Sequence, residues 1–309
     1  MISAVPVTEV YDDFATPAGY SLEHYAEKWV NPFGLGEMQV SDTRRFSSRG
    51  FSVSAAPFET ASDESVFDHL KYIAVSGKKF EVPSAGSIRF DSTIVAETPG
   101  TEGGRVVHGR FSSTGAPYAE STLEGQQGGA VLNMIDFSTG QLFDWFVAGR
   151  TAFALIERLP STITRNTDDP GSSEWVGLEK MYTQIVAEFP IATGPQEVGI
   201  MFSRDSEGAR ADWFLNGAHV AHVEKVGVPL DRQGVPFTGI YPSLGPGEQI
   251  GSKINSFVIG HGLFSMLDAF PFQHPGSPEL AVSIPVEERR WGQGVSATFS
   301  EFRVKTVSN

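Results

Sequence analysis

The sequence contains no cysteine among its 309 residues. Disulfide bonds, thiolate catalysis and cysteine-ligated zinc or iron–sulfur centres are therefore excluded. No stretch approaches the ~18 consecutive apolar residues of a membrane-spanning helix. The first residues also lack the basic and apolar segments of a signal peptide. From these absences we expect a cytoplasmic protein without a membrane partner.

Basic residues are scarce: 23 Lys and Arg stand against 37 Asp and Glu, and the net charge is -14. A nucleic-acid partner is excluded because phosphate binding depends on Lys and Arg. An anionic membrane surface is disfavoured for the same reason. The sequence also lacks a His-Glu-x-x-His metal motif and a phosphate-binding loop with its Lys. We expect no cofactor, while a structural Ca²⁺ held by backbone carbonyls and an Asp stays open.

Turn-forming and aromatic residues are abundant, with 33 Gly, 19 Pro and 23 Phe. Many turns and many aromatics favour a sandwich or a barrel. Helical periodicity is weak, and no segment of 20–50 residues repeats. We predict one all-β domain over residues 1–309, a large antiparallel β-sandwich with few short helices. Its longest loops are expected at 160–178 and 245–278.

Several strands can be placed from alternation of apolar and polar residues. Three of them, 130–137, 142–147 and 151–159, are joined by short turns and must be antiparallel neighbours. The strand 87–97 is followed by a turn and by 105–111, which we expect to return beside it.

Two local signals fix finer details. Asn216-Gly217 between alternating runs predicts a tight hairpin turn. Trp213 and Phe214, on its first arm, must point to opposite faces. In the last strand, 295–307, the apolar positions change parity, so we predict a β-bulge near Ser300-Glu301.

Four segments together resemble the concanavalin A-like lectin/glucanase jelly-roll superfamily. They are Asp12-Asp13-Phe14, the closing Phe299-Ser-Glu-Phe302-Arg-Val, the hairpin Asp212-Trp-Phe-Leu-Asn-Gly-Ala-His-Val and the segment 236–245. The resemblance implies two antiparallel sheets, paired terminal strands and a ligand lying across a concave face. Laminarinase-like members carry Glu-x-Asp-x-x-Glu on one strand. The nearest segment here, Asn133-Met-Ile-Asp136-Phe, keeps one acid and lacks both glutamates.

Acids and aromatics concentrate on the predicted meander and the strand after it. A carboxylate among apolar residues has a raised pKa and can act as a general acid. The catalytic candidates are Asp136, Asp144, Glu157, Glu188 and Tyr182. Alternation places Tyr182 and Glu188 on one face of their strand. The alternative is structural: Asp144 faces solvent, or Glu157 pairs at a strand end with Arg158.

The binding candidates are aromatic residues and one histidine. Trp145, Trp175 and Trp213 could stack on sugar rings. His108 lies on the segment expected to return beside 87–97. Phe264 and Phe270 belong to an apolar segment at 254–275. This segment forms either a lid or wall of a pocket, or packed core, or a contact between copies in a homo-oligomer.

Three functions remain open on this sequence. The first is a cofactor-independent intracellular enzyme, such as a cyclase, isomerase, lyase or hydratase, acting on a small, largely apolar organic substrate. The second is a carbohydrate-binding protein or a diverged glycoside hydrolase with an oligosaccharide ligand. The third is a non-catalytic interaction module. The shape and lining of the cavity distinguish them.

Overall fold

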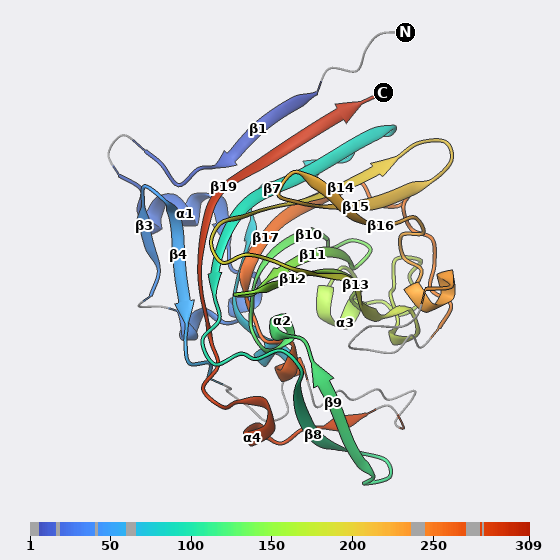
Figure 1. Ribbon diagram of the computed structural model, residues 1–309. Coiled ribbons are helices and arrows are strands. Elements are labelled where there is room, and N and C mark those ends of the chain that lie inside the picture. Colours follow the sequence, from blue (N-terminus) through green and yellow to red (C-terminus); the bar gives the residue numbers. More distant parts are fainter. Residues whose placement is uncertain are drawn as a thin grey trace.

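The computed structural model describes residues 6–16, 19–40, 43–59, 66–235, 245–269, 279 and 281–309. Two large antiparallel sheets, A and B, lie face to face (Figure 1). The expected all-β sandwich is therefore confirmed. Residues 236–244 of the segment that resembles the jelly-roll superfamily, and the candidate Phe270, lie outside the described residues.

Sheet A has eight strands in the order β16–β15–β14–β7–β19–β4–β3, with β1 beside β19. Their bounds are β1 (Val7–Asp12), β3 (Arg45–Ser47), β4 (Gly50–Ala55), β7 (Gly86–Glu97), β14 (Gln196–Arg204), β15 (Ala209–Leu215), β16 (Ala218–Val223) and β19 (Val295–Ser308). The first and last strands pair antiparallel, as the resemblance implied (Figure 1).

Sheet B also has eight strands, in the order β13–β12–β11–β10–β17–β5–β2, with β6 paired to β17. Their bounds are β2 (Trp29–Val30), β5 (Leu70–Ser76), β6 (Phe80–Glu81), β10 (Gly129–Asp136), β11 (Gln141–Val147), β12 (Thr151–Arg158), β13 (Tyr182–Pro190) and β17 (Ser256–Phe264). The predicted meander corresponds to β10, β11 and β12, which are consecutive antiparallel neighbours.

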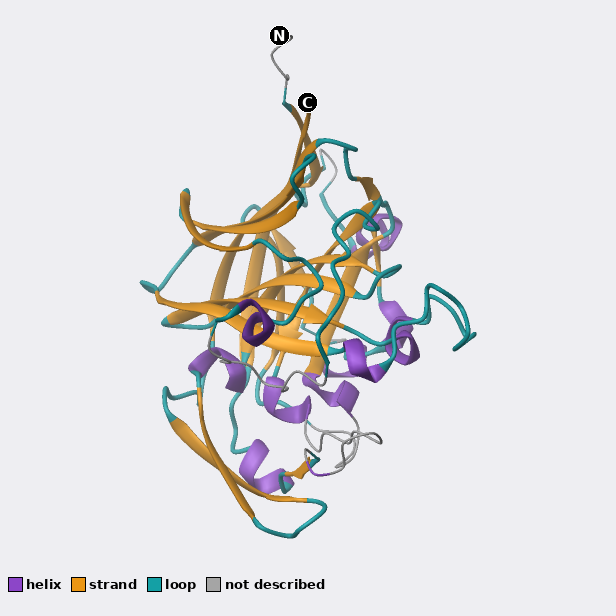
Figure 2. Cartoon of the chain, turned by 90° about the vertical axis from the view of Figure 1, so that its right-hand side faces the viewer, coloured by secondary structure: helices purple, strands orange, loops and turns teal. Residues whose placement is uncertain are grey.

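A third sheet of three strands, β18 (Val282–Ser283), β8 (Arg105–Phe111) and β9 (Pro117–Thr122), lies beyond the ends of the main strands (Figure 2). The α-helices are α1 (Leu22–Lys28), α2 (Glu124–Gln127), α3 (Ser161–Thr164) and α4 (Val286–Arg289). The 3₁₀ turns are η1 (Pro32–Gly34), η2 (Glu37–Gln39), η3 (Val66–His69), η4 (Leu178–Lys180), η5 (Leu230–Gln233) and η6 (Met266–Ala269). No helix in the described ranges is long and apolar enough to cross a membrane.

Two sequence predictions about strand placement are wrong. The segment 105–111 does not return beside β7, because β7 pairs instead with β14 and β19, which come much later in the chain. The predicted loop 245–278 contains β17, a central strand between β10 and β5. Both faces of β17 are buried, so its sequence shows no alternation of apolar and polar residues. Gly260 and Gly262 also weaken the strand signal, because glycine is uncommon in strands.

The two local signals are confirmed. Asn216 and Gly217 both have positive φ, at 51° and 82°, in the turn between β15 and β16. The register between β19 and β7 shifts between Phe299 and Phe302, where the bulge was predicted.

Sheet B is buried on both faces. One face packs against sheet A and contributes residues such as Leu132, Phe143 and Ile156 to the core between the sheets. The other face, which we call the outer face, carries a second apolar cluster that includes Val131, Leu155 and residues of η6 and the third sheet. Strands β10 to β12 are therefore apolar almost throughout, and any polar side chain on the outer face is desolvated.

Two indole groups connect the sheets by reciprocal hydrogen bonds. Trp145 of β11 donates from Nε1 to the backbone oxygen of Gly199 in sheet A, at 2.9 Å. Trp213 of β15 donates from Nε1 to the backbone oxygen of Asp144 in sheet B, at 3.0 Å. Both side chains are fully buried. These bonds hold β11 at a defined height and register against sheet A.

We predict that Trp213→Phe lowers the free energy of unfolding by about 2–4 kcal/mol, because it removes a buried donor and leaves unfilled volume. Urea unfolding followed by circular dichroism measures this change. Trp175→Phe, at a half-buried position in the loop after α3, is the control and should cost less than about 1 kcal/mol. Equal losses in the two variants would contradict the role given to the indole bond.

Candidate functional site

A row of four polar side chains crosses the outer face of sheet B, one from each of four neighbouring strands. They are Asn133 of β10, Asp144 of β11, Glu157 of β12 and Thr183 of β13. Asn133 is paired with Asp144, and Glu157 with Thr183, across the strand ladders. Asp144 lies opposite Leu155, so Glu157 is its diagonal neighbour. Such diagonal positions are about 7 Å apart, within reach of long side chains.

Each carboxyl group of the row has one hydrogen-bond donor beside it. Asn133 Nδ2 donates to Asp144 Oδ1 at 2.7 Å, and Thr183 Oγ1 donates to Glu157 Oε1 at 2.8 Å. Asn133, Asp144 and Thr183 are at most 1% exposed, whereas Glu157 is half-buried. Glu157 is therefore the member of the row that solvent can reach.

Burial dominates the electrostatics of both acids. It raises the pKa of the Asp144 carboxyl well above its usual range; the neighbouring Glu157 carboxylate raises that pKa further, and the Asn133 hydrogen bond opposes the rise. Burial also raises the pKa of Glu157 from 4.5 to about 7, against the opposing effect of the Thr183 hydrogen bond. Near neutral pH, Glu157 is therefore present in both protonation states. The raised pKa of Asp144 favours its protonated form.

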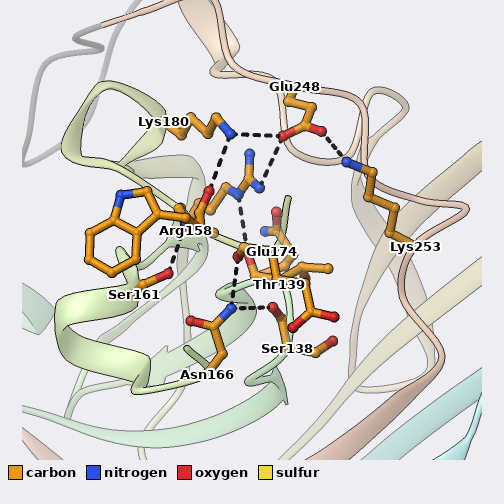
Figure 3. A network of polar contacts seen from close by, with 12 residues as sticks. Ser138, Thr139, Arg158, Ser161, Asn166, Glu174, Lys180, Glu248 and Lys253 are labelled. Carbon is orange, nitrogen blue, oxygen red and sulfur yellow. Dashed lines mark hydrogen bonds and ion pairs between the residues drawn. The ribbon is translucent and has the colours of Figure 1, made fainter. Parts of the chain in front are cut away.

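The surroundings of the pair are apolar. The outer-face cluster contains Leu142 and Leu155 on the two strands that carry the acids, with Ile135, Met181 and Ile185 on or next to neighbouring strands. Arg158, the residue after Glu157, does not neutralise it. Its guanidinium instead contacts the backbone oxygen of Thr139 at 3.1 Å and the carboxylate of Glu248 at 3.4 Å (Figure 3).

Glu248 forms ion pairs with three cationic side chains at this end of sheet B. Besides Arg158, it pairs with Lys180 at 3.6 Å and with Lys253 (Figure 3). The alternative pairing of Glu157 with Arg158 that the sequence left open is therefore not formed.

Gly260 of β17 makes room for the row. A Cβ atom at this position would lie 2.9 Å from Asn133 Oδ1 and 3.0 Å from Asn133 Cβ. Within the described residues, Asn133 Oδ1 is buried and has no hydrogen-bond partner. The Asn133 side chain is thus held by its hydrogen bond to Asp144, and it occupies the space that Gly260 leaves.

The other acid/base candidates lie elsewhere. Asp136 accepts hydrogen bonds from Ser138 and Thr139 and closes the turn after β10. Tyr182 points into the core between the sheets, where its hydroxyl donates to Gln141 at 2.9 Å, and burial raises its pKa. Glu188 is exposed, and burial and the nearby Glu124 raise its pKa.

Tyr182 and Glu188 do not share a face, contrary to the sequence prediction. The register between β12 and β13 shifts between Ala154 and Leu155. This irregularity reverses the parity of β13, so simple alternation fails along this strand.

The binding candidates are also dispersed. Trp145 and Trp213 are fully buried in the core between the sheets and are not available to a ligand. Trp175 is half-buried in the loop after α3, and His108 is exposed on β8 of the third sheet. Phe264 is buried on the outer face, in edge contact with Phe146 at 5.8 Å. Only the acids Asp144 and Glu157 are brought together.

Sequence reasoning missed two members of the row. Asn133 enters the sequence prediction only through the comparison with the glucanase motif, and Thr183 does not enter it. A signal for Asn133 is present, because it is the one polar residue between Val131 and Ile135 on the same face of an apolar strand. Thr183 gives no such signal. In the described part of the chain, no group of three or more His, Asp or Glu side chains is arranged to hold a metal ion.

Residues 11–308 match the model of a family of unknown function, DUF6081. The chain belongs to this family. None of the curated proteins matches the sequence.

Solved structures similar to this DUF6081 protein include three from carbohydrate biology. An endo-1,3-beta-glucanase from Streptomyces sioyaensis is 11% identical, with a TM-score of 0.46, over 99% of this chain and 97% of that one. A family 7 alginate lyase is 11% identical, at 0.41, over 87% and 83%. A legume lectin-like domain from Entamoeba histolytica is 8% identical, at 0.40, over 95% and 96%.

These neighbours are similar to this chain at low identity, with TM-scores below 0.5. At such scores they carry no argument about the reaction or the ligand. The site must be judged from its own residues.

The raised pKa of Glu157 makes stability depend on pH. The folded state holds this proton more tightly than the unfolded state, whose pKa is near 4.5. Its stabilising contribution is therefore complete below pH ~4.5 and is lost as pH rises to ~7, by about 3 kcal/mol. We predict that the stability of the wild type relative to Glu157→Gln falls by this amount between the two limits.

Urea unfolding of both proteins at pH 4.5, 6 and 8 measures the difference. Glu188→Gln, at an exposed position, is the control and should show a smaller pH dependence. A constant difference between wild type and Glu157→Gln would show that Glu157 titrates normally.

Proposed function

We propose that the protein is a cofactor-independent enzyme that performs acid/base chemistry on a small, largely apolar organic substrate at the outer face of sheet B. The observation that carries this proposal is the pair Asp144 and Glu157, set on adjacent strands among apolar side chains. Cyclase, isomerase, lyase and hydratase reactions all fit such a pair.

The two acids differ in the role each can take. Glu157 is half-buried and has a pKa of about 7, which is close to the optimum for a group that both takes and returns a proton at neutral pH. Asp144 is deeper, and burial raises its pKa and so favours the protonated form. It can donate a hydrogen bond to a developing negative charge on the substrate. Asn133 fixes the orientation of the Asp144 carboxyl group.

The lining of the outer face supports an apolar substrate. Leucine, isoleucine and methionine side chains surround the pair and are themselves buried. A ligand group that reaches the half-buried Glu157 therefore meets an apolar environment, which favours apolar groups. Two of the three tryptophans that could have stacked on a sugar are buried between the sheets. An extended oligosaccharide site usually offers such rings on its floor.

A carbohydrate-related activity is the second candidate. Two carboxyl groups on one face of a sheet are also what the cleavage of a glycosidic bond requires. The paired acids favour this function over a purely structural module.

Deuterium incorporation tests the leading proposal. The protein is incubated in D₂O with a panel of small cyclic apolar metabolites and, separately, with an oligosaccharide panel, and the products are analysed by chromatography and mass spectrometry. We expect turnover with deuterium uptake in the first panel. Glu157→Gln should reduce it by about 10²-fold or more, because one acid/base group typically contributes that much.

Glu188→Gln should retain the activity. Cleavage of oligosaccharides alone, lost in Glu157→Gln, would replace the leading proposal with the second candidate. Turnover that Glu157→Gln and Asp144→Asn both retain would remove the acid pair from the reaction.

A further inference from the structure

A pocket lies at the opposite edge of sheet B from the acid row, where α1, β2 and β5 meet. Its volume is about 210 Å³. The polar and aromatic residues that line it are Tyr25, Trp29, Asn31, Glu37, Arg44 and Tyr72. In the strand order of sheet B, β10 and β17 separate this edge from β11, so the pocket is independent of the site proposed above. Figure 1 shows α1 beside β3 and β4.

Two polar atoms at this pocket have unmet hydrogen-bonding capacity. Within the described residues, Asn31 Oδ1 and Arg44 Nε are buried without a partner. The Asn31 amide cannot simply be turned round, because its Nδ2 donates to the backbone oxygen of Leu35 at 3.0 Å. Arg44 uses another nitrogen to contact Glu37 at 3.4 Å. One acceptor and one donor are therefore left, and leaving either unmet is costly.

The inner wall of the pocket is a hydrogen-bonded chain of neutral groups. The hydroxyls of Tyr72 and Tyr25 are 2.6 Å apart, and the Tyr25 hydroxyl is 2.7 Å from His261 Nε2. His261 lies in the core, with its ring centre 4.6 Å from that of Trp29, and burial lowers its pKa to about 3. Burial also raises the pKa of Tyr25. The imidazole and both hydroxyls are thus uncharged at neutral pH.

The volume limits the size of a ligand. It exceeds the ~150 Å³ of an engineered cavity that binds benzene, and it is below the ~300 Å³ at which sites for drug-sized molecules begin. A single ring with a few substituents fits between these limits. Trp29 and Ala74 supply apolar wall for the ring.

The polar groups determine the ligand's chemistry. A hydroxyl both donates and accepts, so hydroxyl groups can serve Asn31 Oδ1 and Arg44 Nε together. A carboxylate could pair with Arg44, but Glu37 already does so, and the Asn31 oxygen and the Glu37 carboxylate would oppose a second negative charge. A neutral ligand is therefore favoured. We propose that this pocket is a second binding site, for a neutral, hydroxylated, single-ring compound. Phenols and cyclic polyols share this chemistry.

Calorimetric titration tests the proposal with three probes: resorcinol, myo-inositol and benzoate. We expect saturable binding of resorcinol, myo-inositol or both, and weaker or no binding of benzoate. Binding of only one neutral probe supports the proposal and shows whether the ligand is a phenol or a cyclic polyol. Absence of binding by both neutral probes, or equally tight binding of benzoate, would overturn it.

Variants locate the binding. Ala26 lines the pocket from the exposed surface of α1, so Ala26→Leu adds bulk there without harming the helix. It should weaken binding at least tenfold. Tyr72→Phe removes one hydroxyl of the inner wall and should weaken binding severalfold. Glu27→Gln, also exposed on α1 but outside the pocket, is the matched control and should bind normally. Unchanged binding in Ala26→Leu would place the ligand elsewhere and overturn the proposal.

Discussion

The candidate site depends on two indole N–H groups that cross between the sheets in opposite directions. Trp145 reaches from β11 to Gly199, and Trp213 reaches back to the backbone oxygen of Asp144. Successive side chains on a strand point to opposite faces. Anchoring Trp145 inward therefore directs Asp144 outward, and the strand ladders then place Glu157 diagonally beside it. The core between the sheets therefore positions Asp144, although this residue lies on the opposite, outer face of sheet B.

The second constraint is desolvation. The outer face of sheet B is covered by apolar side chains, and a carboxylate there lacks the hydration it would have in water. Each acid has one neutral donor beside it, Asn133 or Thr183. In the described part of the chain neither acid is paired with a cation, and Arg158 pairs instead with Glu248. The arrangement favours the protonated form of both acids over the ionised form. It also makes the fold less stable than apolar residues at these positions would. Such a cost is common where side chains serve chemistry.

The parts of the fold that were predictable are those set by local chemistry. Asn216-Gly217 specified a hairpin, and the parity change around Ser300-Glu301 specified a bulge. The parts that failed depend on distant segments. The neighbours of β7 could not be read from its sequence, and β17 was hidden because both its faces are buried. For the site, alternation on β11 places Asp144 and Trp145 on opposite faces, and the structure has them so. It could not separate Tyr182 from Glu188, because an irregularity in β13 lies between them.

Carbon-13 NMR titration of the side-chain carboxyl groups, with Glu157 assigned by comparison with Glu157→Gln, tests the central claim most directly. The claim is that the row of four polar side chains is a desolvated acid pair. It predicts a pKa for Glu157 of about 7, with Asp144 still protonated in the range where ordinary carboxyl groups have ionised. Values near 4 for both groups would mean that water reaches the pair freely, and they would contradict the account.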